Sequence, residues 1–381
     1  HESRGLGDVY KRQHETHAYE NVKFPPSPSL TSAVIFQTMT TVKRLIQSDI
    51  TKTLLFFILT TACAAVITPW LYNAGMMLVE VEATHRTSPV ITWLAQKCAH
   101  AELPRYFNRA MLLCALLLIG PFIMWMRLGQ TGKQPRQSPW RLRLPEHSIA
   151  HDHGQPLTRN PRAWLHLTTG FLLAGSLLTL MVWLLLLTGW FSLTHPLDWI
   201  EATRESLASA AFAGLVEEWI FRGILLGIFL RSLRPAVAIV SVSLLFAALH
   251  FLLPPDGVKV MNPESLDSGF RMVSLIIQRF MHPQTFALSF TTLFAIGLIL
   301  AYARYRTASL WLPIGLHTGW VFVHRLFQHM AELSGKHLAP MEVFIGADRK
   351  SGLLPLCLLI ATGLLVHVFV QISDEKREAS T

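Results

Sequence analysis

Long runs without a charged residue recur through this chain of 381 residues and restrict its fold more than any other feature. A helix needs about 20 predominantly apolar residues to cross the hydrocarbon core of a bilayer. Only 15% of the residues are charged, whereas a soluble chain carries about 25%. We therefore predict an all-α fold, a polytopic membrane helix bundle of about eight transmembrane helices. The predicted spans are 53–79, 110–126, 164–190, 206–230, 235–253, 285–303, 307–323 and 353–372.

Three charged residues lie inside the fourth span: Glu217, Glu218 and Arg222. A charge at the centre of a membrane helix costs roughly 2.5 to 3.5 kcal/mol on insertion scales, so these three need compensation. Glu218 and Arg222 are four residues apart on one helical face, in the favourable order of acid before base. We predict a structural ion pair between them. Glu217 is turned about 100° away from that pair, and it is the candidate for chemistry.

Two histidines lie inside other spans, His250 in the fifth and His317 in the seventh. At a rise of about 1.5 Å per residue, Glu217, His250 and His317 lie about 21, 22 and 15 Å from the predicted cytoplasmic ends of their helices. Helix tilt absorbs a difference of this size. We therefore expect the three side chains to meet. A carboxylate facing two imidazoles either binds a metal ion or moves the protons of an attacking water molecule.

The remaining histidines are weaker candidates. His324 follows His317 by two helical turns on the same face, so it is a candidate outer-shell partner. His367 is alone in the eighth span and is read as a packing residue. A loop run has the short spacing of metal ligands, but only Asp152 accompanies it, and we do not assign it a metal: His147, His151 and His153.

The net charge of +9 does not indicate nucleic acid as a partner, because the basic residues cluster beside the apolar runs. Clusters follow the second, fourth, sixth and eighth spans. Cytoplasmic loops of membrane proteins carry such an excess of Lys and Arg. The pattern predicts a multi-pass protein of the cell membrane, in contact with the lipid bilayer, with both termini cytoplasmic. The four cysteines show no paired spacing and predict no disulfide framework.

The chain divides into four parts by composition. Residues 1–38 are expected to be a non-native or disordered leader, because Met39 precedes a more natural start. Residues 39–163 form an N-terminal two-helix membrane region that ends in a basic cytoplasmic linker, 127–162, with seven Arg or Lys and five prolines. Residues 164–372 form the membrane core, and 373–381 a cytoplasmic tail.

The loop between the fifth and sixth spans predicts one further helix. Apolar residues recur there at helical spacing with two arginines opposite, as in a helix that lies in the membrane interface. The apolar positions are Phe270, Val273, Ile277 and Phe280, and the arginines are Arg271 and Arg279.

The polar residues of the spans also carry a resemblance. Glu217 to Arg222 matches an EExxxR motif, Phe246 to His250 matches FxxxH, and His317 fits a third motif. In this order on successive apolar helices, they resemble the CPBP family, which comprises CAAX prenyl-protein endopeptidases and their bacterial ABI relatives. The resemblance covers about 164–372 and implies an eight-helix intramembrane peptidase. It implies that Glu217 and His250 activate water, while His317 binds metal or stabilises the oxyanion.

One position departs from the family pattern. Asn often stands four residues after the last His, and here that residue is Val321, which cannot donate a hydrogen bond to an oxyanion. Either another side chain substitutes, or His317 acts alone, or the activity is altered. The candidates for this oxyanion or outer-shell role are Phe246, Trp320, His324 and Thr318. A site of Glu217, His250 and His317 suits Zn²⁺ with an open water position, and it equally suits a metal-free mechanism.

Three functions compete on this evidence. The first is an intramembrane endopeptidase that hydrolyses a peptide bond of a membrane-associated protein or peptide by Glu/His-activated water. The second is a non-catalytic membrane binding or immunity protein that retains the motifs, which Val321 favours. The third is a proton-coupled transporter, which the lack of an internal repeat disfavours.

Overall fold

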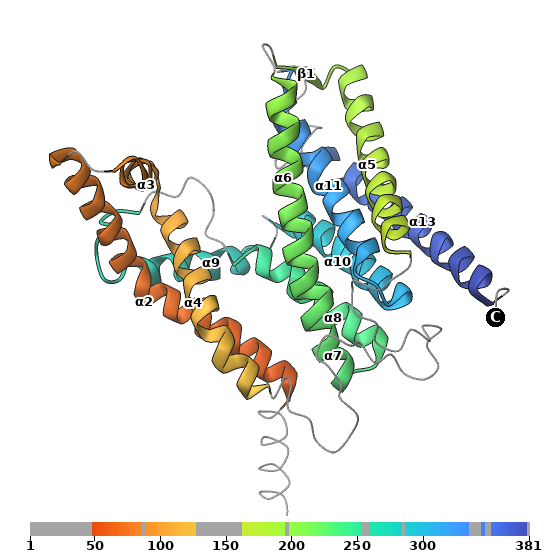
Figure 1. Ribbon diagram of the computed structural model, residues 1–381, viewed down its shortest axis with the longest axis horizontal. Helices are drawn as coiled ribbons and strands as arrows, with labels where there is room; N and C mark the ends of the chain where they lie inside the picture. The colour runs from red at the N-terminus through yellow and green to blue at the C-terminus, as the bar shows by residue number, and fades with distance from the viewer. Residues whose placement is uncertain are drawn as a thin grey trace, which may run out of the picture. The chain divides into compact units, whose positions relative to one another are not determined.

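The computed structural model describes residues 48–85, 88–126, 162–194, 198–252, 260–283, 286–334, 344–346 and 352–378. These residues fold into helices and one short two-stranded ribbon (Figure 1). The predicted leader, most of the 127–162 linker and the loop histidines His147, His151 and His153 lie outside the described residues.

Each of the eight predicted spans contains a helix. These helices are α2 (Asp49–Thr84), α4 (Leu103–Trp125), α5 (Ala163–Leu187), α6 (Trp199–Glu218), α8 (Pro235–His250), α10 (Ala287–Thr307), α11 (Trp311–Met330) and α13 (Leu353–Glu378). Beyond Glu218 the helix continues as a π-helix, η2 (Trp219–Leu225), and then as α7 (Leu226–Ser232). The structure adds two helices that are not among the spans, α3 (Pro89–Ala99) and α9 (Ser268–Met281). The all-α membrane bundle is confirmed.

The number of spans is not confirmed as eight. Within the described residues, five helices are long and apolar enough to cross a membrane: α2, α4, α5, α10 and α13. The helix α8 is apolar but has only 16 residues. The helices α6 and α11 carry too many polar and charged residues to qualify. These three less suited helices are the ones that carry the candidate site. Polar residues at membrane depth face the interior of a bundle. We therefore expect the more apolar helices to surround the site.

The helix α11 lies at the centre of the site region and packs against α5 and α6 (Figure 1). Its contact with α5 is made by glycines that bring the two backbones together. A Cβ atom at Gly315 would collide with the carbonyl oxygen of Leu167, and one at Gly319 would lie 2.6 Å from the carbonyl oxygen of Phe171. Small residues four apart are the usual means by which membrane helices approach closely. We call this α5–α11 contact the glycine seam.

The helix α6 approaches α11 from the other side in a similar way. A Cβ atom at Gly214 would collide with the hydroxyl oxygen of Thr318, which lies one residue after His317. The helix that carries His317 is thus held between two neighbours by contacts that leave no room for a larger side chain. This close packing fixes the position of the imidazole.

The helices α8 and α10 complete the walls around the Glu pair. They pack against each other, and α10 also packs against α13. Phe246 of α8 is 1% exposed and packs edge-on against Phe221 of η2, with ring centroids 5.0 Å apart. A Cβ atom at Gly297 of α10 would lie 2.9 Å from the side chain of Ser243 of α8. These contacts form a densely packed and mostly apolar layer beside Glu217, Glu218 and Arg222.

The helices α2 and α4 pack against each other, and α9 packs against α2. The helix α9 runs across these two rather than along them (Figure 1). Phe270, Ile277 and Phe280 are exposed, as expected for an apolar face turned outward, whereas Met272 and Ile276 are buried against α2. Burial of α9 in the membrane interface remains a prediction.

A short antiparallel ribbon joins the loop after α5 to the end of α11. The strands β1 (Phe191–Leu193) and β2 (Ala331–Leu333) pair with Phe191 opposite Leu333. Phe191 also packs edge-to-face against Phe327 of α11, with ring centroids 4.8 Å apart. Three-residue strands give no alternating pattern that sequence reasoning could detect. The ribbon fastens the ends of α5 and α11 to each other.

Candidate active site

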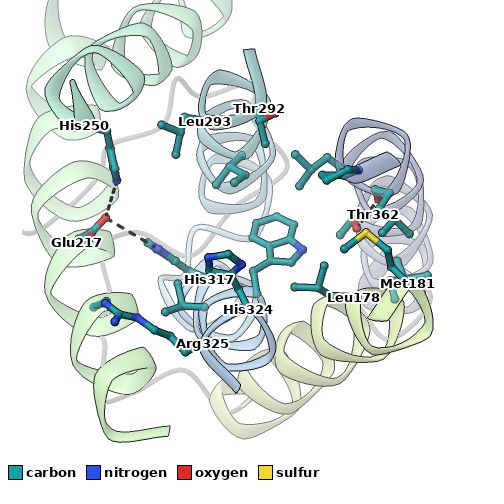
Figure 2. Close-up of a pocket in the computed structure, with 18 of the residues that line it drawn as sticks. Leu178, Met181, Glu217, His250, Thr292, Leu293, His317, His324, Arg325 and Thr362 are labelled. Carbon is teal, nitrogen blue, oxygen red and sulfur yellow. Dashed lines mark hydrogen bonds and ion pairs between the residues drawn. The ribbon is translucent and has the colours of Figure 1, made fainter. Parts of the chain in front are cut away.

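Glu217 lies between the two membrane histidines. Its Oε2 atom is 3.8 Å from Nε2 of His250 and 4.0 Å from Nε2 of His317 (Figure 2). Oε2 is buried and has no hydrogen-bond partner among the described residues. The distances are too long for direct hydrogen bonds, and polar contacts of this length are commonly bridged by a water molecule. The three residues predicted from the sequence therefore come together.

The orientation of His250 is set by its own helix. Its Nδ1 atom lies 2.8 Å from the carbonyl oxygen of Phe246, one turn earlier on α8. A carbonyl oxygen only accepts hydrogen bonds, so Nδ1 carries the proton and donates it. In the neutral ring, Nε2 is then an acceptor, and it is the atom that faces Glu217.

The orientation of His317 is set by Glu218. Nδ1 of His317 lies 2.7 Å from Oε1 of Glu218, and the same oxygen accepts a hydrogen bond of 2.7 Å from NH1 of Arg222. The side chains of Glu218 and Arg222 are fully buried. The predicted Glu218–Arg222 ion pair is thus present, but it is not self-contained, because Glu218 also holds the site histidine. Sequence reasoning missed this contact, since the two residues are 99 positions apart.

Arg222 is held on several sides. Its guanidinium lies 4.4 Å from the centroid of the Phe246 ring and 5.7 Å from that of Phe221. NH2 of Arg222 donates a long hydrogen bond of 3.4 Å to the carbonyl oxygen of Gly297. Cation–π contacts of this kind gain strength when the cation is desolvated. Phe246 therefore supports Arg222 with its ring and His250 with its carbonyl oxygen.

The π-helix η2 follows directly after the Glu pair. Single π-turns within α-helices are rare and occur frequently at functional sites. Here the wider turn contains Arg222 and Phe221, both buried, and ends before Leu226. No pattern in the sequence indicated it.

A cavity of about 420 Å³ opens at these residues (Figure 2). Glu217, His250 and His317 lie at its wall, and the rest of the lining is mostly apolar. The lining residues are Leu177, Leu178, Met181, Ala213, Glu217, Phe246, His250, Thr292, Leu293, Ile296, His317, Trp320, Val321, His324, Arg325, Gln328, Pro355, Leu358, Leu359 and Thr362. A mostly apolar cavity with a few convergent polar groups is the usual form of a ligand site.

The structure separates the oxyanion and outer-shell candidates. Trp320, Val321 and His324 line the cavity, and His324 follows His317 by two turns of α11 (Figure 2). Thr318 is not part of the lining, because its hydroxyl contacts Gly214 of α6. His367 is also outside the lining and shares a hydrogen bond of 2.6 Å with the hydroxyl of Tyr302.

Two imidazole nitrogens and a carboxylate oxygen are donors that zinc accepts. The carboxylate of Glu218 behind His317 is the kind of outer partner that orients a metal-bound imidazole. However, no group of three His, Cys, Asp or Glu side chains in the described part of the chain is arranged closely enough to hold a metal ion. The donor types fit zinc, whereas their present spacing does not.

The fold and this site define the class of the protein: a multi-pass membrane protein with a carboxylate and two imidazoles inside its helix bundle. Residues 199–323 match the family model described as type II CAAX prenyl endopeptidase, Rce1-like. The match includes both glutamates, Arg222 and both site histidines, whereas α2 to α5 and α13 lie outside it. No curated protein and no solved structure matches the chain.

The family match confirms the resemblance that the three sequence motifs indicated. Over residues 199–323 the chain is similar to the CAAX prenyl endopeptidases, which are the group that the motifs indicated.

Proposed function

We propose that this protein is an intramembrane endopeptidase in which Glu217 activates a water molecule. The family match supports a CAAX-type protease. The observation that carries the mechanism is the position of Glu217 Oε2, which is buried without a hydrogen-bond partner and 3.8 and 4.0 Å from two imidazole nitrogens. A water molecule placed among the three atoms can donate to the carboxylate and to Nε2 of His250.

In the proposed reaction, Glu217 takes one proton from this water while its oxygen attacks the carbonyl carbon of the scissile bond. The carbon–nitrogen bond then breaks as the proton passes from Glu217 to the leaving amine. His250 accepts a hydrogen bond from the water and aligns it for attack. General-base catalysis of this kind contributes about 10²- to 10⁴-fold to a rate.

His317 is assigned to the oxyanion. It lies between two carboxylates, with Nδ1 facing Glu218 and Nε2 facing Glu217. This role requires a proton on both ring nitrogens of His317, with Nδ1–H donating to Oε1 of Glu218. Its Nε2–H would then donate to the developing oxyanion, which is the role that Val321 cannot fill.

Zinc remains a proposal. If zinc is used, Glu217, His250 and His317 would hold it, and bound zinc would lower the pKa of its water molecule. The steps above use only the residues of the chain and stand without it. The proposed setting is the cell membrane, with both termini at the cytoplasmic face and a membrane-associated protein or peptide as the substrate.

The second candidate is a non-catalytic binding or immunity protein. Val321 favours it, because this cavity residue supplies no hydrogen-bond donor at the position where the family often has one.

The test is cleavage of S-prenylated peptides by purified protein in detergent micelles. Glu217→Gln keeps the shape of the side chain but cannot accept the proton, so cleavage should fall by at least 10²-fold. The matched control is Glu205→Gln, an exposed glutamate on the same helix outside the cavity, which should cleave at the wild-type rate. Full activity of Glu217→Gln would refute the peptidase assignment and leave the binding protein in its place.

A further inference from the structure

Arg304 is a buried cation in the last turn of α10. Its side chain is 7% exposed, and its Nε atom is buried without a hydrogen-bond partner. In the part of the chain that the structure describes, no hydrogen bond or ion pair joins Arg304 to another residue. Arg222 is also buried, but it is bound to Glu218. Arginine is almost never fully buried unless it is paired, so Arg304 calls for an anion that these residues do not supply.

The packing of α10 on α8 places Arg304 beside the beginning of α8. A Cβ atom at Gly297 of α10 would lie 2.9 Å from the side chain of Ser243 of α8. Further toward the end of α10, Ala301 shares a buried cluster with Ala238, which is nearer the beginning of α8. The two helices therefore run antiparallel. Arg304 follows Gly297 by two turns on the same face, so it lies level with the first turn of α8.

The first turn of α8 also lacks an anion. The helix begins at Pro235, and its N-cap residue is Arg234, whose side chain caps no backbone group. The backbone N–H groups of Ala236 and Val237 have no carbonyl one turn earlier in the helix to bind. Arg234 is exposed and forms no hydrogen bond or ion pair within the described ranges. The positive end of the helix dipole thus lies beside two cations.

The neighbouring helices supply no carboxylate to this place. Of the described elements around it, η2, α7, α8, α10 and α11 contain no Asp or Glu. Glu218, at the end of α6, is already bound to Arg222 and His317. The helix α13 contacts the opposite side of α10, where the hydroxyl of Tyr302 and the ring of His367 share a hydrogen bond. The two arginines therefore have no counter-ion among these described elements.

A phosphate group fits this set of donors. A guanidinium binds two phosphate oxygens at once, and the backbone N–H groups at the start of a helix bind a further oxygen. The 21 residues of α10 are about 31 Å long, which matches the hydrocarbon core of a bilayer at about 30 Å. The last turn of α10 therefore lies at the level of the lipid phosphates. Basic pockets between membrane helices bind the headgroups of anionic lipids at this level.

We propose that Arg304, Arg234 and the first turn of α8 form a binding site for a phosphate monoester at the membrane surface. Neither arginine lines the cavity that holds Glu217. The headgroup of phosphatidic acid carries such a phosphate, and inorganic phosphate from solution offers the same oxygens, so the test must separate the two sources. The proposal does not depend on the peptidase function, and its test uses no cleavage.

The experiment measures the unfolding of purified protein in nanodiscs of three compositions. These are phosphatidylcholine alone, phosphatidylcholine with phosphatidic acid, and phosphatidylcholine with oleate at the same surface charge. For the wild-type protein, phosphatidic acid should raise the ratio of folded to unfolded protein by about 10- to 100-fold, as for a ligand at about 10 to 100 times its Kd. Oleate should have a smaller effect. Equal stabilisation by inorganic phosphate added to phosphatidylcholine nanodiscs would support the site and identify a soluble source.

Arg304→Gln should abolish this stabilisation. In phosphatidylcholine alone the variant should be at least as stable as the wild type, because it removes a buried charge that has no partner. Arg234→Gln, at an exposed position, should fold normally and lose part of the stabilisation. The matched control is Arg306→Gln, which removes the same charge on the opposite side of α10, where Arg306 donates to the hydroxyl of Tyr302. It should keep the wild-type response to phosphatidic acid.

Native mass spectrometry makes the result independent of stability. The wild type and Arg306→Gln should retain one more phosphatidic acid molecule than Arg304→Gln.

Three outcomes would overturn the site. The first is an Arg304→Gln protein that phosphatidic acid stabilises as much as it does the wild type. The second is an equal effect of oleate and phosphatidic acid, which would show that surface charge alone is responsible. The third is a wild-type protein that neither phosphatidic acid nor inorganic phosphate stabilises. If Arg304→Gln does not accumulate, Arg234→Gln decides, and its full retention of the lipid effect would refute the site.

Discussion

The two adjacent glutamates should respond in opposite ways to the same substitution. Glu218→Gln is expected to lower both stability and activity, whereas Glu217→Gln should lower activity alone. The reason is that Oε1 of Glu218 accepts two hydrogen bonds of 2.7 Å, from Arg222 and from His317, in a fully buried position. Glu217 Oε2 has no hydrogen-bond partner to lose.

The size of the effect follows from these contacts. Removing one partner of a buried ion pair costs about 3 to 5 kcal/mol, because the other charge remains buried. Arg222 keeps its contact with the Phe246 ring at 4.4 Å, so we expect a value near 3 kcal/mol. That value corresponds to a decrease of about 100-fold in the ratio of folded to unfolded protein. Loss of the partner of His317 should lower kcat by about 10- to 100-fold, as for outer-shell partners of other site histidines.

The assay pairs unfolding by sodium dodecyl sulfate in mixed micelles with peptide cleavage at matched protein levels. The double variant Glu218→Gln/Arg222→Met tests the cause. It removes the stranded cation, so stability should recover, since a buried ion pair replaced by apolar groups is often neutral or stabilising. Activity should not recover, because His317 still lacks its carboxylate. Equal stability of Glu218→Gln and Glu217→Gln would contradict this reasoning. It would show that the carboxylate of Glu218, which Arg222 and His317 share, does not stabilise the fold.

Four further outcomes are expected. Gly315→Ala should destabilise the protein by about 1 to 3 kcal/mol or more, because its Cβ would collide with the Leu167 carbonyl, whereas Gly120→Ala, with nothing within 4 Å, should be neutral in the same unfolding assay. Val321→Asn should leave kcat unchanged or raise it by supplying an oxyanion donor; a lower kcat would argue against this placement. If zinc is used, purified wild-type protein should contain about one equivalent and His250→Ala much less, by elemental analysis; zinc absent from active protein would settle the metal-free route. A cysteine placed in the 127–162 linker should resist impermeant labelling reagents added outside the cell, and labelling there would reverse the predicted orientation.

The sequence was sufficient to predict the membrane bundle and the meeting of Glu217, His250 and His317. Uncharged runs locate helices because the bilayer leaves few alternatives, and titratable residues inside such runs are costly enough to indicate a site. The count of spans was less certain, since α6 and α11 are polar on the faces that meet at the site.

The contacts that the sequence did not predict depend on helix packing. The hydrogen bond between Glu218 and His317 joins two helices that only the fold brings together. The sequence paired Glu218 with Arg222, four residues away, and that pair left no reason to expect a second partner. One sequence pattern did indicate the close packing of α11, although it was not used in the prediction. Gly315 and Gly319 flank His317 four residues apart, a pattern typical of close helix packing in membranes. Arg325 could not be assigned to the cavity before the positions of α5 and α13 were known.

The glycine seam relates the depth of the His317 imidazole in the membrane to the thickness of the bilayer. The helix α5 has 25 residues and is about 37 Å long, whereas the hydrocarbon core of a bilayer is about 30 Å thick. A helix longer than the membrane accommodates the mismatch by tilting. Because the seam joins backbone to backbone, α11 must tilt together with α5 and carry His317 with it. If the proposed peptidase function holds, a thinner or thicker membrane therefore shifts the level at which a substrate must present its bond.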